Sequence, residues 1–127
     1  MPTPTYTERL EVPRPDLASL VERYRRNELK LIDLLVAVLL EQGGPVPSGE
    51  AAARLAEVGV SHWNEDLETI LKRSLAPSLE VILDGEGRFA LSTLDPSDRR
   101  LRRRLRNLDP PPPPGESRRR ARRLPAR

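Results

Sequence analysis

The apolar residues in the first third of the chain recur at helical spacing. Over residues 17–38 they return at steps of three, four and seven, with no glycine or proline between them. This spacing predicts either one long helix or two abutting helices over 15–42, begun by Pro15. Its second half is apolar on nearly every side, which is typical of a helix covered on most faces. We expect Gly43 and Gly44 to end it.

Two shorter helices are predicted next. Ser48 is expected to cap the segment EAAARLAEVG, with Gly59 in the C-cap position. Ser61 is expected to cap a third helix, HWNEDLETILKRSL, which carries one apolar stripe and should end before Pro77.

Alternating apolar residues then predict a β-hairpin. The residues expected on its inner face are Leu79, Val81, Leu83, Phe89 and Leu91. The segment 84–87, Asp-Gly-Glu-Gly, supplies the left-handed backbone positions of a tight turn. Two strands alone are marginal in water, so we expect the hairpin to lie against the helices and to recruit Val46 as a third, minimal strand. Helix, short strand, helix, helix, hairpin is the element order of a winged helix, with the hairpin as its wing.

Several segments resemble a known family. They are the apolar helix that ends in Gly43-Gly44, the Pro45-Val46-Pro47 step, the small second helix and the wing ending GEGRFAL. Over residues 28–92 the chain resembles the HARE-type winged helix-turn-helix, a module shared by the delta subunit of bacterial RNA polymerase and many bacterial nucleic-acid enzymes. The resemblance implies a DNA-associated or transcription-associated adaptor with no catalysis of its own.

The predicted fold class is mainly α with a small β-hairpin wing (α+β), a winged helix-turn-helix with an N-terminal helical extension and a disordered basic tail. Residues 1–14 carry three prolines and are expected to be an extended leader. Residues 15–94 form the winged-helix domain. Residues 95–109 are an Arg-rich amphipathic helix capped by Ser97, whose narrow leucine stripe could dock on the core or on a partner. Residues 110–127 are a Pro-rich spacer and basic tail that should not fold.

Charge is distributed very unevenly along the chain. Residues 99–127 carry twelve arginines against Asp109 and Glu116, a balance of +10, whereas residues 1–98 have a balance of −7. A basic block of this kind is typical of an arm that binds polyanions. A compositional bias towards arginine would produce the same block, and a tail that folds back on the acidic body would mask it. The arginines expected to contact nucleic acid are Arg88, Arg99, Arg100, Arg102, Arg103, Arg104, Arg106, Arg118, Arg119, Arg120, Arg122 and Arg123.

The sequence offers no catalytic constellation. There is no cysteine, which excludes disulfides, thiolate metal sites and cysteine nucleophiles, and His62 is the single histidine. Trp63 and Phe89 are most simply packing residues. We therefore predict a protein that is not an enzyme and needs neither cofactor nor metal. With no apolar segment long enough to span a bilayer and no secretion signal, a cytoplasmic location without membrane contact is expected.

The predicted third helix is acidic where a DNA-reading helix would meet bases. Its first turns hold Glu65, Asp66 and Glu68, which would repel phosphates, so we expect these acids to contact a protein instead. The leading hypothesis is a non-enzymatic protein that binds DNA or RNA, with DNA favoured, through its arginines without sequence preference. Its acidic domain would recruit a protein such as RNA polymerase or another DNA-associated complex. The alternative is a protein-interaction or dimerisation subunit of a transcription-related complex without direct nucleic-acid binding, pairing with itself or with a partner through the helix over 15–42.

Overall fold

The computed structural model describes residues 4–60, 66–75 and 80–109. Within them the chain forms six helices and a small antiparallel sheet of three strands, which confirms the predicted mainly helical α+β class. The elements in chain order are α1 (Tyr6–Leu10), α2 (Leu17–Arg25), α3 (Leu31–Gln42), β1 (Val46–Pro47), α4 (Ser48–Glu57), α5 (Leu67–Ser74), β2 (Val81–Leu83), β3 (Arg88–Leu91) and α6 (Arg99–Leu108).

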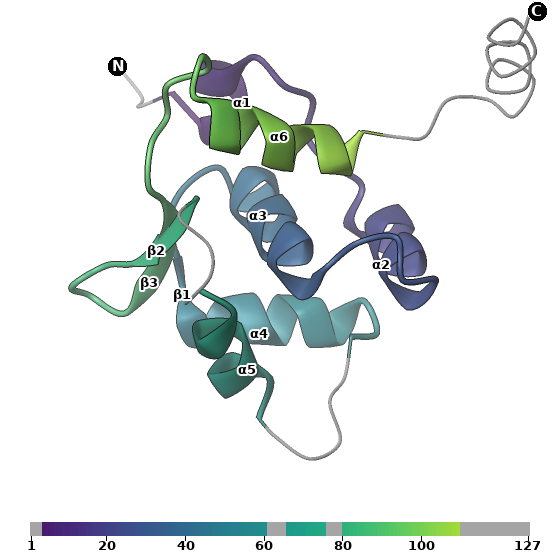
Figure 1. Ribbon diagram of the computed structural model, residues 1–127. Helices are drawn as coiled ribbons and strands as arrows, with labels where there is room; N and C mark the ends of the chain where they lie inside the picture. The colour runs from purple at the N-terminus through teal and green to yellow at the C-terminus, as the bar shows by residue number, and fades with distance from the viewer. Residues whose placement is uncertain (1–3, 61–65, 76–79, 110–127) are drawn as a thin grey trace, which may run out of the picture.

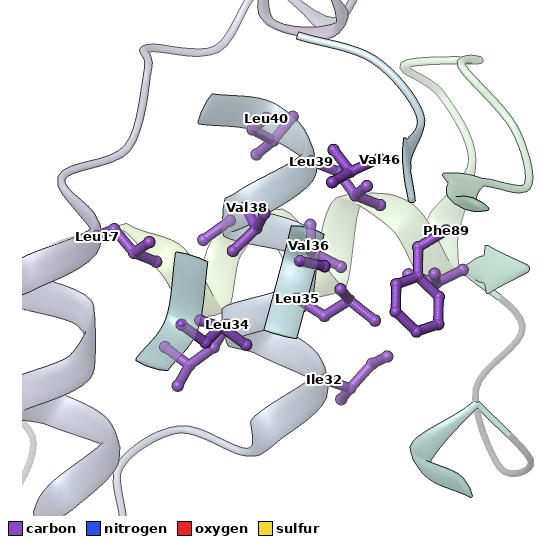
Figure 2. Close-up of a cluster of buried hydrophobic side chains, with 14 of the residues drawn as sticks. Leu17, Ile32, Leu34, Leu35, Val36, Val38, Leu39, Leu40, Val46 and Phe89 are labelled. Atoms are coloured by element: carbon purple, nitrogen blue, oxygen red, sulfur yellow. The ribbon is translucent and has the colours of Figure 1, made fainter. Parts of the chain in front are cut away.

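Helix α3 is the centre of the fold. It contacts α1, α2, α4, α5, α6 and β3, and Figure 1 shows it between α1 and α6 on one side and α4 on the other. Every residue from 32 to 40 is buried, including Asp33. Figure 2 shows the apolar side chains of α3 spreading in several directions, with Leu17 of α2 on one side and Phe89 of β3 on the other. The all-round apolar pattern therefore correctly predicted a helix covered on most faces.

The segment over 15–42 is two separate helices, and its first part begins later than Pro15. Helix α2 starts at Leu17, and the chain turns before α3, with Asn27 at φ 63°. Asparagine tolerates this left-handed backbone better than most residues, so it can end a helix where no glycine or proline marks the break. Gly43, at φ 85°, ends α3 as predicted.

The prediction of an extended leader is wrong for residues 6–10, which form α1. Its first turn is a capping box, in which the hydroxyl of Thr5 accepts the backbone N–H of Glu8 and the carboxylate of Glu8 accepts the backbone N–H of Thr5. Tyr6 and Leu10 are buried, and the N–H of Tyr6 donates to the carbonyl of Gly43 at 3.2 Å. Helix α1 thus closes over the C-terminal end of α3.

The predicted cap at Ser48 needs correction. Ser48 is the first residue of α4 and Pro47 is the N-cap, while the Ser48 hydroxyl donates to Glu68 of α5. Helix α5 begins at Leu67 after Asp66, whose side chain accepts the N–H of Thr69 and whose extended backbone prevents an earlier start. The predicted Ser61 cap and the predicted stop at Pro77 lie outside the described residues, as do His62 and Trp63. Gly59 follows Val58, the C-cap of α4.

The sheet has the order β1-β3-β2, so the prediction that Val46 joins the hairpin is confirmed by its pairing with Phe89. Of the two glycines in the turn, only Gly87 has a left-handed backbone, at φ 77°. Gly85 and Glu86 are the central residues of the turn, and the N–H of Gly87 closes it by donating to the carbonyl of Asp84. Leu83 is 41% exposed rather than buried, although Phe89, its partner across the strand pair, is fully buried. The difference follows from the strand order, because β3 is the central strand of the sheet and β2 is an edge strand.

Candidate nucleic-acid interface

Helix α6 begins at an aspartate cap and docks on the core. The carboxylate of Asp98 accepts the N–H of Leu101 at 2.9 Å, so Asp98 and not the predicted Ser97 caps the helix. Leu101 is fully buried, and Leu105 and Leu108 are partly buried against the core. Of the two alternatives left open for the leucine stripe, the structure shows docking on the chain's own core.

Arg104 anchors the middle of α6 to the body. One nitrogen, Nη1, lies 2.7 Å from Oδ1 of Asp33, and Nη2 lies 3.3 Å from Oε1 of Glu80. Asn107, one turn further on, donates to the same Asp33 oxygen at 3.3 Å. The Arg104 side chain is only 16% exposed and that of Asp33 only 3%. Arg104 therefore neutralises a buried carboxylate and does not belong among the arginines available to nucleic acid, where the sequence had placed it.

A second arginine holds the C-terminal end of α6. Arg23 of α2 donates from Nη1 to the carbonyl of Asp109 and from Nη2 to that of Asn107, both at 3.0 Å. The last carbonyls of a helix lack partners within the helix and carry the negative end of its dipole, so a guanidinium there stabilises the helix end. Sequence reasoning missed Arg23, because nothing in its spacing connects it with a helix more than 80 residues away.

The five remaining arginines of α6 point into solution. Within the described part of the chain none of them forms an ion pair with an acidic side chain, and all five are exposed. They are Arg99, Arg100, Arg102, Arg103 and Arg106. At about 100° per residue, four of them share one face at the spacing i, i+3, i+4, i+7, and Arg100 lies apart from that face. We call the four, Arg99, Arg102, Arg103 and Arg106, the arginine stripe.

Two adjoining grooves flank α6. One, of about 760 Å³, runs between the arginine stripe and residues 10–12 after α1, with Pro96 and Ser97 at one end. The other, of about 380 Å³, is mainly apolar and is lined by the 12–16 linker, Leu20, Leu40 and Leu108. Val12, Leu105 and Asp109 line both grooves, so the basic surface passes directly into the apolar one.

The other predicted cation of the folded part, Arg88, is already compensated. Its Nε lies 2.9 Å from Asp84 and its Nη2 lies 3.4 Å from Glu86. Hydrogen bonds from the Arg88 and Glu86 backbone N–H groups and the Arg88 guanidinium lower the pKa of Asp84, so this carboxylate stays charged beside the arginine. The wing thus offers little free positive charge. Arg118, Arg119, Arg120, Arg122 and Arg123 lie outside the described residues.

The acids predicted to contact a protein have structural partners where they are described. Asp66 caps α5. Glu68 accepts the hydroxyl of Ser48 and pairs with Lys72 at 3.4 Å, and the Ser48 hydrogen bond, followed by that of Lys72, lowers the pKa of Glu68. Glu65 lies outside the described residues. The two described acids therefore do not form a free acidic patch at the start of α5.

A metal site and a membrane span each place requirements on the described residues. Across residues 4–60, 66–75 and 80–109 no group of histidine, aspartate or glutamate side chains is placed to hold a metal ion. In the same ranges no helix combines the length and the apolar content of a bilayer span. The chain matches no protein-family model, no curated protein and no solved structure.

Proposed function

We propose that the protein is a non-enzymatic, nucleic-acid-associated winged helix-turn-helix protein, which binds nucleic acid without sequence preference through the arginine-rich segment 99–127. The observation that carries the proposal is the set of five exposed arginines on α6, unpaired with acids among the described residues, on a helix anchored by Leu101, Arg104 and Arg23. Arginines that neutralise phosphates release condensed counterions, which provides affinity without reading bases.

The winged-helix part of the proposal is supported by the pairing of Val46 with Phe89, which adds the short third strand to the hairpin. In a winged helix-turn-helix α5 would take the place of the recognition helix, but its Asp66 and Glu68 disfavour approach to phosphates and its Lys72 is paired. Base reading by α5 is therefore not part of the proposal. The folded body instead carries α6 and recruits a protein, RNA polymerase or another DNA-associated complex.

The experiment measures binding of fluorescently labelled random-sequence DNA and RNA by anisotropy between about 50 and 200 mM salt. A variant with all five exposed arginines of α6 changed to glutamine keeps Leu101, Arg104 and Asp98, and so keeps the docking contacts. If five phosphate contacts are lost, the slope of log K against log salt on duplex DNA becomes shallower by about 4 to 5. A second variant that ends at Asp109 measures how much residues 110–127 contribute to nucleic-acid binding.

Lys72→Gln is the control, because it removes one cation from the opposite part of the fold. Binding that is unchanged in both arginine variants, or no binding of the full chain to any random sequence at low salt, would refute the proposal. That result would favour the alternative, a protein-interaction subunit without direct contact to nucleic acid.

A further inference from the structure

The arginine stripe faces a groove and not open solvent alone. From Arg99 to Arg106 a helix advances about 10 Å, so the stripe presents four guanidinium groups along one straight edge. The opposite wall is the short segment 10–12, which contributes the apolar side chains of Leu10 and Val12 and one acid, Glu11. A row of cations along a groove matches a linear polyanion better than a single compact anion.

The apolar groove beside the arginine stripe places a second requirement on a ligand. Its volume of about 380 Å³ lies within the roughly 300–1,000 Å³ of pockets that bind small organic molecules. Its walls include Leu20, Leu40 and Leu108. It opens into the basic groove at Val12, Leu105 and Asp109, and the Asp109 carbonyl accepts a hydrogen bond from Arg23. A ligand that fills both grooves therefore has an anionic chain with apolar groups attached to it.

We infer that these joined grooves bind single-stranded nucleic acid, with phosphates along the arginine stripe and one or more bases in the apolar groove. The inference rests on the proposed function and narrows it. A duplex keeps its bases stacked and paired inside, so it can offer its phosphates to the stripe but no base to the apolar groove. A single strand offers both. Proteins that hold single strands without sequence preference combine a basic groove with side chains on which bases stack, aromatic ones and arginines, and here the aliphatic walls and the arginines of the apolar groove would take that place.

The test uses the full chain and two matched variants. Arg102→Gln/Arg106→Gln removes two groups of the stripe, and Arg100→Gln removes an exposed arginine of the same helix that lies off the stripe. The probes are a labelled oligothymidine, a hairpin duplex with the same number of phosphates, and inorganic polyphosphate as a competitor. Urea denaturation of each variant establishes that it folds as the unchanged chain does.

At about 0.1 M salt each lost single-strand phosphate contact weakens binding about fivefold, so the double variant should lose about 25-fold for oligothymidine. Arg100→Gln should lose less than twofold. Oligothymidine should bind more tightly than the duplex at equal phosphate number, and polyphosphate should compete weakly, because it has no bases.

Three results would overturn the inference while leaving the proposed function intact. These are a loss of affinity in Arg100→Gln as large as the loss per arginine in Arg102→Gln/Arg106→Gln, tighter binding of the duplex, or polyphosphate competing as well as an oligonucleotide of equal charge. Absence of binding to every nucleic acid would instead remove the proposed function as well.

Discussion

Replacement of Arg104 by methionine tests how α6 is held. The substitution keeps an unbranched apolar chain but removes the guanidinium that lies 2.7 Å from Asp33. The carboxylate of Asp33 would stay buried, with its hydrogen bonds from the Lys30 N–H at 2.8 Å and from Asn107 at 3.3 Å. Removing one member of a buried ion pair destabilises a protein by about 3–5 kcal/mol. Because two hydrogen bonds to Asp33 remain, we expect the lower end, about 3 kcal/mol.

The assay is urea denaturation followed by far-ultraviolet circular dichroism. With a slope of roughly 1–2 kcal/mol per M urea for a chain of this size, a loss of about 3 kcal/mol lowers the midpoint by about 1.5–3 M. Arg100→Met is the matched control, since Arg100 is exposed on the same helix and has no acidic partner among the described residues. We expect it to change the free energy of unfolding by less than about 0.5 kcal/mol.

A double-mutant cycle isolates the pair itself. Asp33→Asn keeps an oxygen that can accept the Lys30 N–H, and the double variant Asp33→Asn/Arg104→Met removes both charges. If the ion pair holds α6 in place, the cycle gives an interaction free energy of at least about 1.5 kcal/mol. Strictly additive effects, or an Arg104→Met variant as stable as Arg100→Met, would refute the anchoring role.

Three further predictions concern stability. Glu41 accepts two hydrogen bonds from Arg54, at 2.8 and 2.7 Å, and the Arg54 guanidinium is the main cause of its lowered pKa. A carboxylate whose pKa is lower in the folded than in the unfolded state stabilises the fold above its unfolded pKa, and this stabilisation is lost as the pH falls through its folded pKa. The difference in free energy of unfolding between the unchanged chain and Arg54→Gln should therefore shrink as the pH falls from about 5 to about 3, measured by urea denaturation at each pH. Gly87→Ala, at φ 77°, should destabilise by about 1–2 kcal/mol, whereas Gly85→Ala, which has open space around it, should change the free energy of unfolding by less than about 0.5 kcal/mol in the same assay. Leu101→Ala should lower the free energy of unfolding by about 2–5 kcal/mol, because Leu101 is fully buried; a smaller loss would show that α6 docks loosely.

The elements that could be predicted from sequence are those in which local pattern and tertiary burial agree. The apolar run of α3, the glycine stop at Gly43 and the pairing of Val46 with the hairpin all follow from spacing, proline placement and the marginal stability of a two-stranded ribbon. The sequence left open one long helix or two abutting helices over 15–42, and it did not locate the break at Asn27, because no glycine or proline marks that point. Helix α1 had a recognisable signal, the Thr5 to Glu8 capping box, which the surrounding prolines obscured.

The site was predictable only in outline. Charge alone identified the arginines of α6 but treated all six as equivalent, since one-dimensional charge patterning carries no information on what faces each side chain. The assignment of Arg104 to the core requires knowing that Asp33, 71 residues earlier, lies beneath it. The same holds for the cap by Arg23 and for the two grooves, which exist because residues 10–16 run beside α6.

The anchoring of α6 and its capacity to bind polyanions are linked by one physical requirement. Six arginines in ten residues place like charges at i, i+3 and i, i+4, which destabilises an isolated helix. Within the fold, the ion pairs of Arg104 with Asp33 and Glu80 offset part of this repulsion, and the buried side chain of Leu101 holds the helix against the core. The stripe arginines have no such compensation among the described residues. The repulsion between them is therefore offset by the contacts that other residues of α6 make with the core. The docked helix holds the cations in a fixed row before any ligand binds, which lowers the entropic cost of binding. Phosphates that bind there also reduce the repulsion between the arginines, which destabilises the unliganded fold.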